Sequence, residues 1–144
     1  MVRQNKDFNY QTGEVIRTGY YAGPWFHYGI VVAINGKIYV AHNSTKNEGG
    51  CPHLDEIQDF ILERYITRSY GVLTNLNANQ ILDKLNAVKD RRFNYLTWNC
   101  EDFVNYVIGK PGYFKLGKII MVSITAISIA ILLYGIYKLT KLIK

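Results

Sequence analysis

The clearest pattern of hydrophobic and polar residues in this chain is that of a β-hairpin. An apolar run rich in β-branched residues extends from Tyr28 to Ile34, and a second run extends from Lys37 to His42. Asn35-Gly36 separates them, and Asn-Gly between two such runs is typical of a two-residue hairpin turn. We therefore predict two antiparallel strands, with the beginning of the first close to the end of the second.

Two later segments have the spacing of amphipathic helices. Apolar residues recur every three or four positions from 81 to 88, after polar residues at 77–80 that can cap a helix. A second helix is predicted from Cys100 to about Ile108, with Asn99 as its N-cap and a glycine and a proline just beyond its end. Both helices can pack an apolar face against the predicted strands.

Weaker patterns complete the folded region. Residues 13–17 and 63–70 are predicted as strands, residues 43–50 as a polar loop, and residues 52–61 as a short helix or turn. The predicted fold class is therefore α+β, a small antiparallel sheet packed against helices.

The C-terminal segment has a different pattern. No charged residue and no proline occurs from Ile119 to Tyr137. A helix of this length, at about 1.5 Å per residue, spans roughly the 30 Å hydrocarbon core of a bilayer. Its few hydroxyl groups are too sparse for the polar stripe of a soluble helix, so we predict a single transmembrane helix.

The surroundings of this helix bear on its orientation. Lysines lie on both sides of it, so the positive-inside rule assigns no orientation. No secretory signal is recognised in the polar residues 1–6, which favours a C-terminal tail anchor with the folded domain in the cytosol. The flanking lysines are Lys115, Lys118, Lys138, Lys141 and Lys144.

The net charge of +6 belongs mainly to the membrane end. Removing the five flanking lysines from the 17 basic residues leaves 12, against 11 acidic residues. A balance near zero argues against a nucleic-acid-binding groove and favours anionic phospholipid headgroups as partners. The oligomeric state cannot be predicted from the sequence.

The chain has two cysteines, Cys51 and Cys100. Without a secretory signal a disulfide between them is not the first expectation, although an oxidising compartment would allow one. Cys51-Pro52-His53 has metal-ligand residue types, but a single Cys-x-His without a second pair is a weak motif. We predict no metal and no cofactor, and leave the role of Cys51 open.

Cys100 is the candidate nucleophile. Unpaired amides and the positive end of the dipole at a helix start both favour a thiolate over a thiol. A thiol nucleophile also needs a base and a group that orients the base. His27 and His42 lie at the two outer ends of the predicted hairpin, where they can supply both.

The same residues resemble a known family. The motifs His27-Tyr28-Gly29-Ile30, Val40-Ala41-His42 and Asn99-Cys100-Glu101-Asp102 are similar to those of lecithin retinol acyltransferase-like proteins, including the H-Ras-like suppressor phospholipase/acyltransferases. These proteins are circularly permuted relatives of the NlpC-type papain-like peptidases. The resemblance covers roughly residues 13–109, and a C-terminal hydrophobic anchor agrees with it.

The resemblance implies roles and an activity. Cys100 would be the nucleophile, His27 the general base and His42 the residue that orients His27. A glycerophospholipid ester would acylate Cys100, and water, an amine or an alcohol would resolve the thioester. Amides at the helix start, with Asn99 as a candidate donor, could stabilise the oxyanion. Asp102 departs from the histidine usual at this position in animal members, which bears on the subfamily.

The expected organisation follows from these assignments: a catalytic domain at 1–110, a juxtamembrane linker at 111–118, an anchor at 119–137 and a basic tail at 138–144. Two alternatives remain at this stage. One is a thiol peptidase or amidase of the same fold, and the other is a membrane adaptor without catalytic activity. If Cys100 and His27 of the enzyme form a thiolate–imidazolium pair, the rate should rise with an apparent pKa well below that of a free thiol and fall when the histidine deprotonates.

Overall fold

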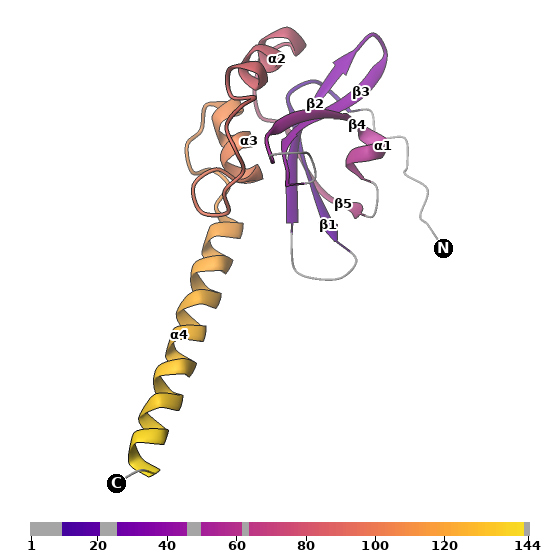
Figure 1. Ribbon diagram of the computed structural model, residues 1–144. Coiled ribbons are helices and arrows are strands. Elements are labelled where there is room, and N and C mark those ends of the chain that lie inside the picture. The colour runs from indigo at the N-terminus through magenta and orange to yellow at the C-terminus, as the bar shows by residue number, and fades with distance from the viewer. Residues whose placement is uncertain (1–9, 21–25, 46–49, 62–63, 143–144) are drawn as a thin grey trace. The chain divides into compact units, whose positions relative to one another are not determined.

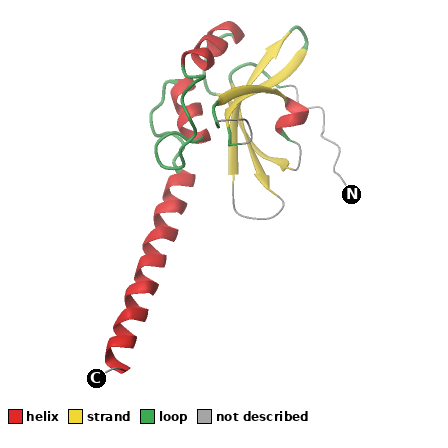
Figure 2. Ribbon diagram, viewed as in Figure 1, coloured by secondary structure: helices red, strands yellow, loops and turns green. Residues whose placement is uncertain are grey.

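The computed structural model describes residues 10–20, 26–45, 50–61 and 64–142. The predictions for residues 1–6, 46–49, 63 and 144 lie outside the described residues. The chain divides into two compact units, Met1–Phe114 and Lys115–Lys144. Figures 1 and 2 show the elements, which are in chain order β1 (Glu14–Tyr20), β2 (Phe26–Ile34), β3 (Lys37–Asn43), β4 (Pro52–Glu56), α1 (Ile57–Phe60), β5 (Arg64–Val72), α2 (Ala78–Ala87), α3 (Cys100–Ile108) and α4 (Leu116–Leu142).

The first unit is built on an open antiparallel sheet of five strands, in the order β4-β3-β2-β1-β5. The predicted hairpin is confirmed as β2 and β3, with Ile34 paired to Lys37 across the turn. Both turn residues have positive φ angles, 49° at Asn35 and 76° at Gly36, as a type I′ turn requires. The α+β class predicted from the sequence is thus present.

The two faces of the sheet carry separate hydrophobic clusters. On the helix face, Tyr28, Ile30, Val32 and Ala41 pack in one cluster with residues of α2 and α3. On the opposite face, the Phe60 face, the second cluster consists of Ile16, Val31, Val40 and Phe60. Figure 1 shows α2 and α3 on one side of the sheet and α1 on the other. The alternation along β2 and β3 therefore assigns each of their side chains to one face.

The prediction for residues 52–61 was wrong in its first half. Pro52–Glu56 forms a strand, β4, which pairs with β3, and the helix α1 begins only at Ile57. No local pattern indicated this strand, because it is short and becomes a strand by pairing with the edge of β3. Its pairing with β3 is central to the site, since it places His53 opposite His42.

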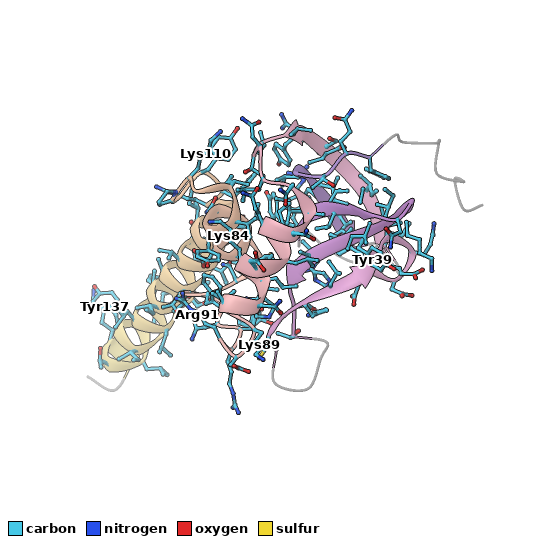
Figure 3. All side chains as sticks on the ribbon, turned by 90° about the horizontal axis from the view of Figure 1, so that it is seen from above. Tyr39, Lys84, Lys89, Arg91, Lys110 and Tyr137 are labelled. Atoms are coloured by element: carbon cyan, nitrogen blue, oxygen red, sulfur yellow. The ribbon has the colours of Figure 1, made fainter. Side chains whose placement is uncertain are left out.

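Helices α2 and α3 lie where the sequence predicts them, and each has a complete capping box. Lys84 of α2 donates to the carbonyl oxygen of Tyr106 in α3 at 3.3 Å, with its ammonium 4.8 Å from the Tyr106 ring centre. Arg91 lies over the ring of Trp98, just before α3, at 3.7 Å. Both cations are labelled in Figure 3. The Lys84 contacts hold α2 against α3, and the Arg91 contact holds the segment that precedes Cys100.

The first unit extends to Phe114, four residues past the expected boundary at 110. The Asn105 side chain donates to the carbonyl of Phe114 and accepts from its amide, each at 2.9 Å. The buried Phe114 ring packs 4.9 Å from the ring of Tyr28 and 5.0 Å from that of Tyr70. This residue belongs to the core, although the sequence assigned it to a linker.

The second unit is the single helix α4. Its segment Val122–Lys141 is long and apolar enough to cross a membrane, by length and composition. The helix begins before and ends after the predicted segment 119–137, because the flanking lysines and threonine are compatible with a helix. The apolar C-terminal helix predicted from the sequence is therefore present.

Candidate active site

The two histidines predicted to act together do lie together. His27 is the second residue of β2 and His42 the sixth of β3, and both point to the Phe60 face. Nε2 of His27 and Nδ1 of His42 are 2.9 Å apart. Their rings lie 5.3 Å and 4.9 Å from the ring of Phe60. Since His27 is 6% and His42 2% exposed, the hydrogen bond between them is shielded from water.

Gly29 leaves the space that the side chains of Val40 and Phe60 occupy beside the histidines. A methyl group at this position would overlap the side chain of Val40 and lie 3.1 Å from two ring atoms of Phe60. Only glycine leaves the space between these two side chains. The glycine of the His-Tyr-Gly-Ile motif thus has a packing role.

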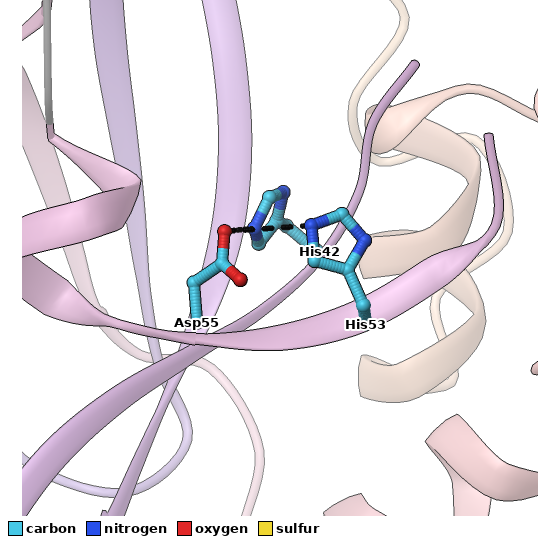
Figure 4. Close-up of side chains that lie close together, drawn as sticks. All are labelled: His42, His53 and Asp55. Atoms are coloured by element: carbon cyan, nitrogen blue, oxygen red, sulfur yellow. Dashed lines mark hydrogen bonds and ion pairs between the residues drawn. The ribbon is translucent and has the colours of Figure 1, made fainter. Parts of the chain in front are cut away.

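Asp55 extends the pair into a chain of three groups. Nε2 of His42 is 2.9 Å from Oδ2 of Asp55 on β4, as Figure 4 shows. The hydrogen bond from His42 lowers the pKa of Asp55, and the nearby histidines lower it further, although partial burial opposes them. Asp55 is thus a carboxylate near neutral pH. We call Asp55, His42 and His27 the relay.

The carboxylate determines which ring nitrogens carry protons. A carboxylate only accepts hydrogen bonds, so Nε2 of His42 must be the donor. In neutral His42 the other nitrogen, Nδ1, then accepts, and Nε2 of His27 donates to it. Neutral His27 is left with an unprotonated Nδ1. A general base needs an unprotonated ring nitrogen, and the hydrogen bond to His42 fixes the His27 ring; the catalytic roles of both residues remain predictions.

Cys100 begins α3 as predicted. The Asn99 side chain accepts from the amides of Glu101 at 2.8 Å and Asp102 at 3.1 Å. In return, the Asp102 carboxylate accepts from the Asn99 amide at 3.1 Å. Asp102, which departs from the family pattern, therefore closes the capping box. Asn99 also donates from Nδ2 to the carbonyl of Tyr95 at 3.0 Å, so its observed role is structural. Its role as an oxyanion donor remains a prediction.

The predicted low pKa of the thiol is wrong for this conformation. Burial raises the pKa of Cys100 to about 12, since Cys100 is 8% exposed and lies within the core. The backbone amides of Tyr28, Glu101 and Cys100 itself lower it, as a helix start should, while the Glu101 carboxylate raises it. Desolvation exceeds the effect of the amides. The thiol is neutral, so the expected ion pair with His27 is not formed.

Cys100 and the relay belong to different faces of the sheet. Cys100 packs in the cluster of the helix face, whereas the two histidine rings contact Phe60 on the other. Two contacts nevertheless hold the start of α3 against the strands beside these histidines. The thiol interacts with the backbone amide of Tyr28, the neighbour of His27. Asn43, the neighbour of His42, donates to the carbonyl of Trp98 at 2.9 Å.

The structure adds two residues that the sequence argument did not assign to the site. They are Asp55 and His53, both on β4 and both on the Phe60 face. No periodicity could have indicated them, because they reach His42 only through the pairing of β3 with β4. No protein-family model, curated protein or solved structure matches this chain.

Proposed function

We propose that this chain is a membrane-anchored thiol enzyme that transfers acyl groups from glycerophospholipid esters through a thioester on Cys100. The arrangement would be that of the lecithin retinol acyltransferase-like, permuted papain-like enzymes that the sequence resembles. The observation that carries the proposal is the relay, because it leaves His27 with an unprotonated Nδ1 in a buried site. A buried, oriented imidazole is well suited to general-base catalysis.

The proposed reaction has two halves. In the first, the Cys100 thiol gives its proton to Nδ1 of His27 as the sulfur attacks the ester carbonyl carbon. The bond to the glycerol oxygen then breaks, and this oxygen takes the proton from His27, which releases a lysophospholipid. In the second half, water, an amine or an alcohol attacks the thioester, gives up its proton through His27 and restores the thiol.

This reaction requires the thiol to reach the imidazole. The sulfur lies at the backbone of Tyr28, the residue after His27, but it packs on the helix face. The proposal therefore includes a rearrangement at the start of β2 and α3 when a substrate binds. His27 then removes the proton during the attack, since a thiol of this pKa is not ionised beforehand.

The C-terminal helix supports a lipid substrate. α4 provides a candidate membrane span, and lysines lie on both sides of its apolar part. Inserted in a bilayer, the helix would hold the first unit at the surface where phospholipid esters are found. We propose that the first unit faces the cytosol.

A non-catalytic membrane adaptor is the second candidate, and the burial of Cys100 favours it. A small, buried, protonated cysteine in a hydrophobic cluster is the usual state of a structural cysteine. Under this hypothesis the relay only stabilises the pairing of three strands. The two candidates differ in whether the Cys100 sulfur becomes acylated.

A lipid product assay tests the proposal. The full chain, reconstituted in vesicles of mixed phospholipids, should release lysophospholipid and form an acylated protein that hydroxylamine cleaves. Cys100→Ala should abolish both products, whereas Cys51→Ala is the matched control and should retain them. Release of lysophospholipid by Cys100→Ala would refute the proposal. Cleavage of a peptide substrate without release of lipid products would identify a peptidase. If neither substrate reacts, the non-catalytic adaptor becomes the favoured hypothesis.

A further inference from the structure

A second group of side chains lies where β4 pairs with β3, on the Phe60 face. His42 and His53 are directly paired across the two strands, and Asp55 follows His53 on the same face of β4. One ligand atom from each residue lies within 4.8 Å of the other two. Figure 4 shows these side chains converging. His42 is buried, but His53 and Asp55 come from an edge strand and have side-chain exposures of 15% and 32%.

The hydrogen bonds of His53 make this group unusual. Nδ1 of His53 is 2.8 Å from the carbonyl oxygen of Cys51. A carbonyl can only accept, so Nδ1 carries the proton, and the lone pair of the neutral ring is on Nε2. This lone pair faces Oδ2 of Asp55 at 3.4 Å. Two acceptors in this position repel each other. The contact requires either a second proton on the ring, which makes His53 an imidazolium that donates to Asp55, or another positive charge between the two atoms.

Such a charge can be a metal ion. A ring whose Nδ1–H donates to a backbone carbonyl is held with Nε2 ready to coordinate, as histidine ligands commonly are. We propose that His42, His53 and Asp55 bind one divalent transition-metal ion of the zinc class. Two imidazoles and a carboxylate suit Zn²⁺ better than Mg²⁺ or Ca²⁺, which prefer oxygen ligands.

The separations can be compared with those of a tetrahedral site. Ligand bonds of about 2.0–2.2 Å to zinc place neighbouring donors roughly 3.3–3.5 Å apart. The distance from Asp55 Oδ2 to His53 Nε2, 3.4 Å, lies in this range. On metal binding, the 2.9 Å distance from Asp55 Oδ2 to His42 Nε2 must lengthen slightly. Ligand atoms that are as much as 4.8 Å apart without the metal must move closer together. His53, on the edge strand, is the ligand best placed to move.

Binding of this ion would have a consequence for the relay, and this consequence rests on the proposed function. Nε2 of His42 is the nitrogen that donates to Asp55 in the relay, and it is also the nitrogen that would ligate the metal. It cannot do both at once. Metal binding therefore replaces the hydrogen bond from His42 to Asp55 and places the proton of neutral His42 on Nδ1. Nδ1 then donates to Nε2 of His27, so neutral His27 carries its own proton on Nδ1 and loses the base.

Calorimetric titration of the full chain in detergent micelles with Zn²⁺ alone tests the site, after a chelator has removed any bound metal. We expect one ion per chain. Affinity should fall at least about tenfold in His53→Ala and in Asp55→Asn, since loss of even an outer-shell partner costs that much. Asp59→Asn, at an exposed carboxylate in α1, and Cys51→Ser are the matched controls and should bind as the wild type does. Absence of binding, or wild-type affinity in both ligand variants, would overturn the proposal.

A second measurement uses the lipid assay, with each protein compared to its own metal-free rate. Zn²⁺ should inhibit the wild type at the concentrations that fill the site, and inhibition of His53→Ala should need at least about tenfold more Zn²⁺. If Zn²⁺ binds but does not slow the release of lysophospholipid, the conclusion that the metal competes with the relay is wrong. If the metal-free wild type releases no lipid product, the proposed function fails, whereas the calorimetric titration still decides the metal site.

Discussion

The ionisation of the Cys100 thiol is the property in which the structure and the local sequence argument differ most. A thiol with a pKa of about 12 is a thiolate in only about 1 molecule in 10⁵ at pH 7. An ordinary thiol, with a pKa near 8.5, is about 3% ionised at the same pH, a difference of roughly three thousandfold. At about pH 10 we expect roughly 1% of the Cys100 thiol to be ionised, whereas an ordinary thiol would be more than 90% ionised.

Ultraviolet absorbance of the thiolate measures this directly. The spectrum of Cys51→Ser contains only the Cys100 thiol, and subtraction of the spectrum of the double variant without either cysteine isolates its signal. We expect no Cys100 thiolate signal up to about pH 9 and only a small one near pH 10. A titration centred at or below about 8.5 in the folded protein would refute the conclusion that burial exceeds the effect of the helix start.

The same pKa shift limits the stability of the protein at high pH. The thiol of the unfolded chain ionises near its ordinary pKa, about 8.5–9, while the folded state keeps its proton up to about 12. The stabilisation is therefore complete below the unfolded pKa and is lost as the pH rises toward the folded value. The loss is up to about 1.4 kcal/mol per pH unit, so circular dichroism must confirm folding at each point of the titration.

Two further predictions concern the framework of the site. Gly29→Ala should lower the free energy of unfolding by about 1–3 kcal/mol in urea denaturation, because the added methyl overlaps Val40 and crowds Phe60; unchanged stability would contradict this packing. Asn99→Ala should cost about 1–2 kcal/mol in the same assay, because it removes the N-cap of α3, whereas Asn99→Ser should recover most of the loss; equal losses in both variants would argue against capping as the cause.

The parts of the fold that were predictable depend on neighbours in sequence. Asn35-Gly36 determines the hairpin, and the Asn99 cap together with the positive φ of Gly109 marks both ends of α3. β4 was not predictable, because its five residues carry no local strand pattern and form a strand only by pairing with β3. Short edge strands of this kind are determined by tertiary pairing more than by propensity.

The same division applies to the site. Proximity of His27 and His42 follows from the hairpin, so the sequence could predict it. Asp55 and His53 join them only through β4, which was missed. The ionisation of Cys100 depends on two opposing effects, and only the amides at the helix start are visible in a local sequence. Desolvation depends on the tertiary packing of the cluster that contains Cys100, whose buried residues include some from three strands.

The clustering of the imidazoles has a spectroscopic consequence. The chain contains three histidines, and all three lie in one connected group on neighbouring strands. Every imidazole signal in a nuclear magnetic resonance spectrum of the full chain therefore reports on this site, with no background from other histidines. Nitrogen-15 labelling of histidine alone would distinguish protonated, unprotonated and metal-bound ring nitrogens in the protein without any substitution.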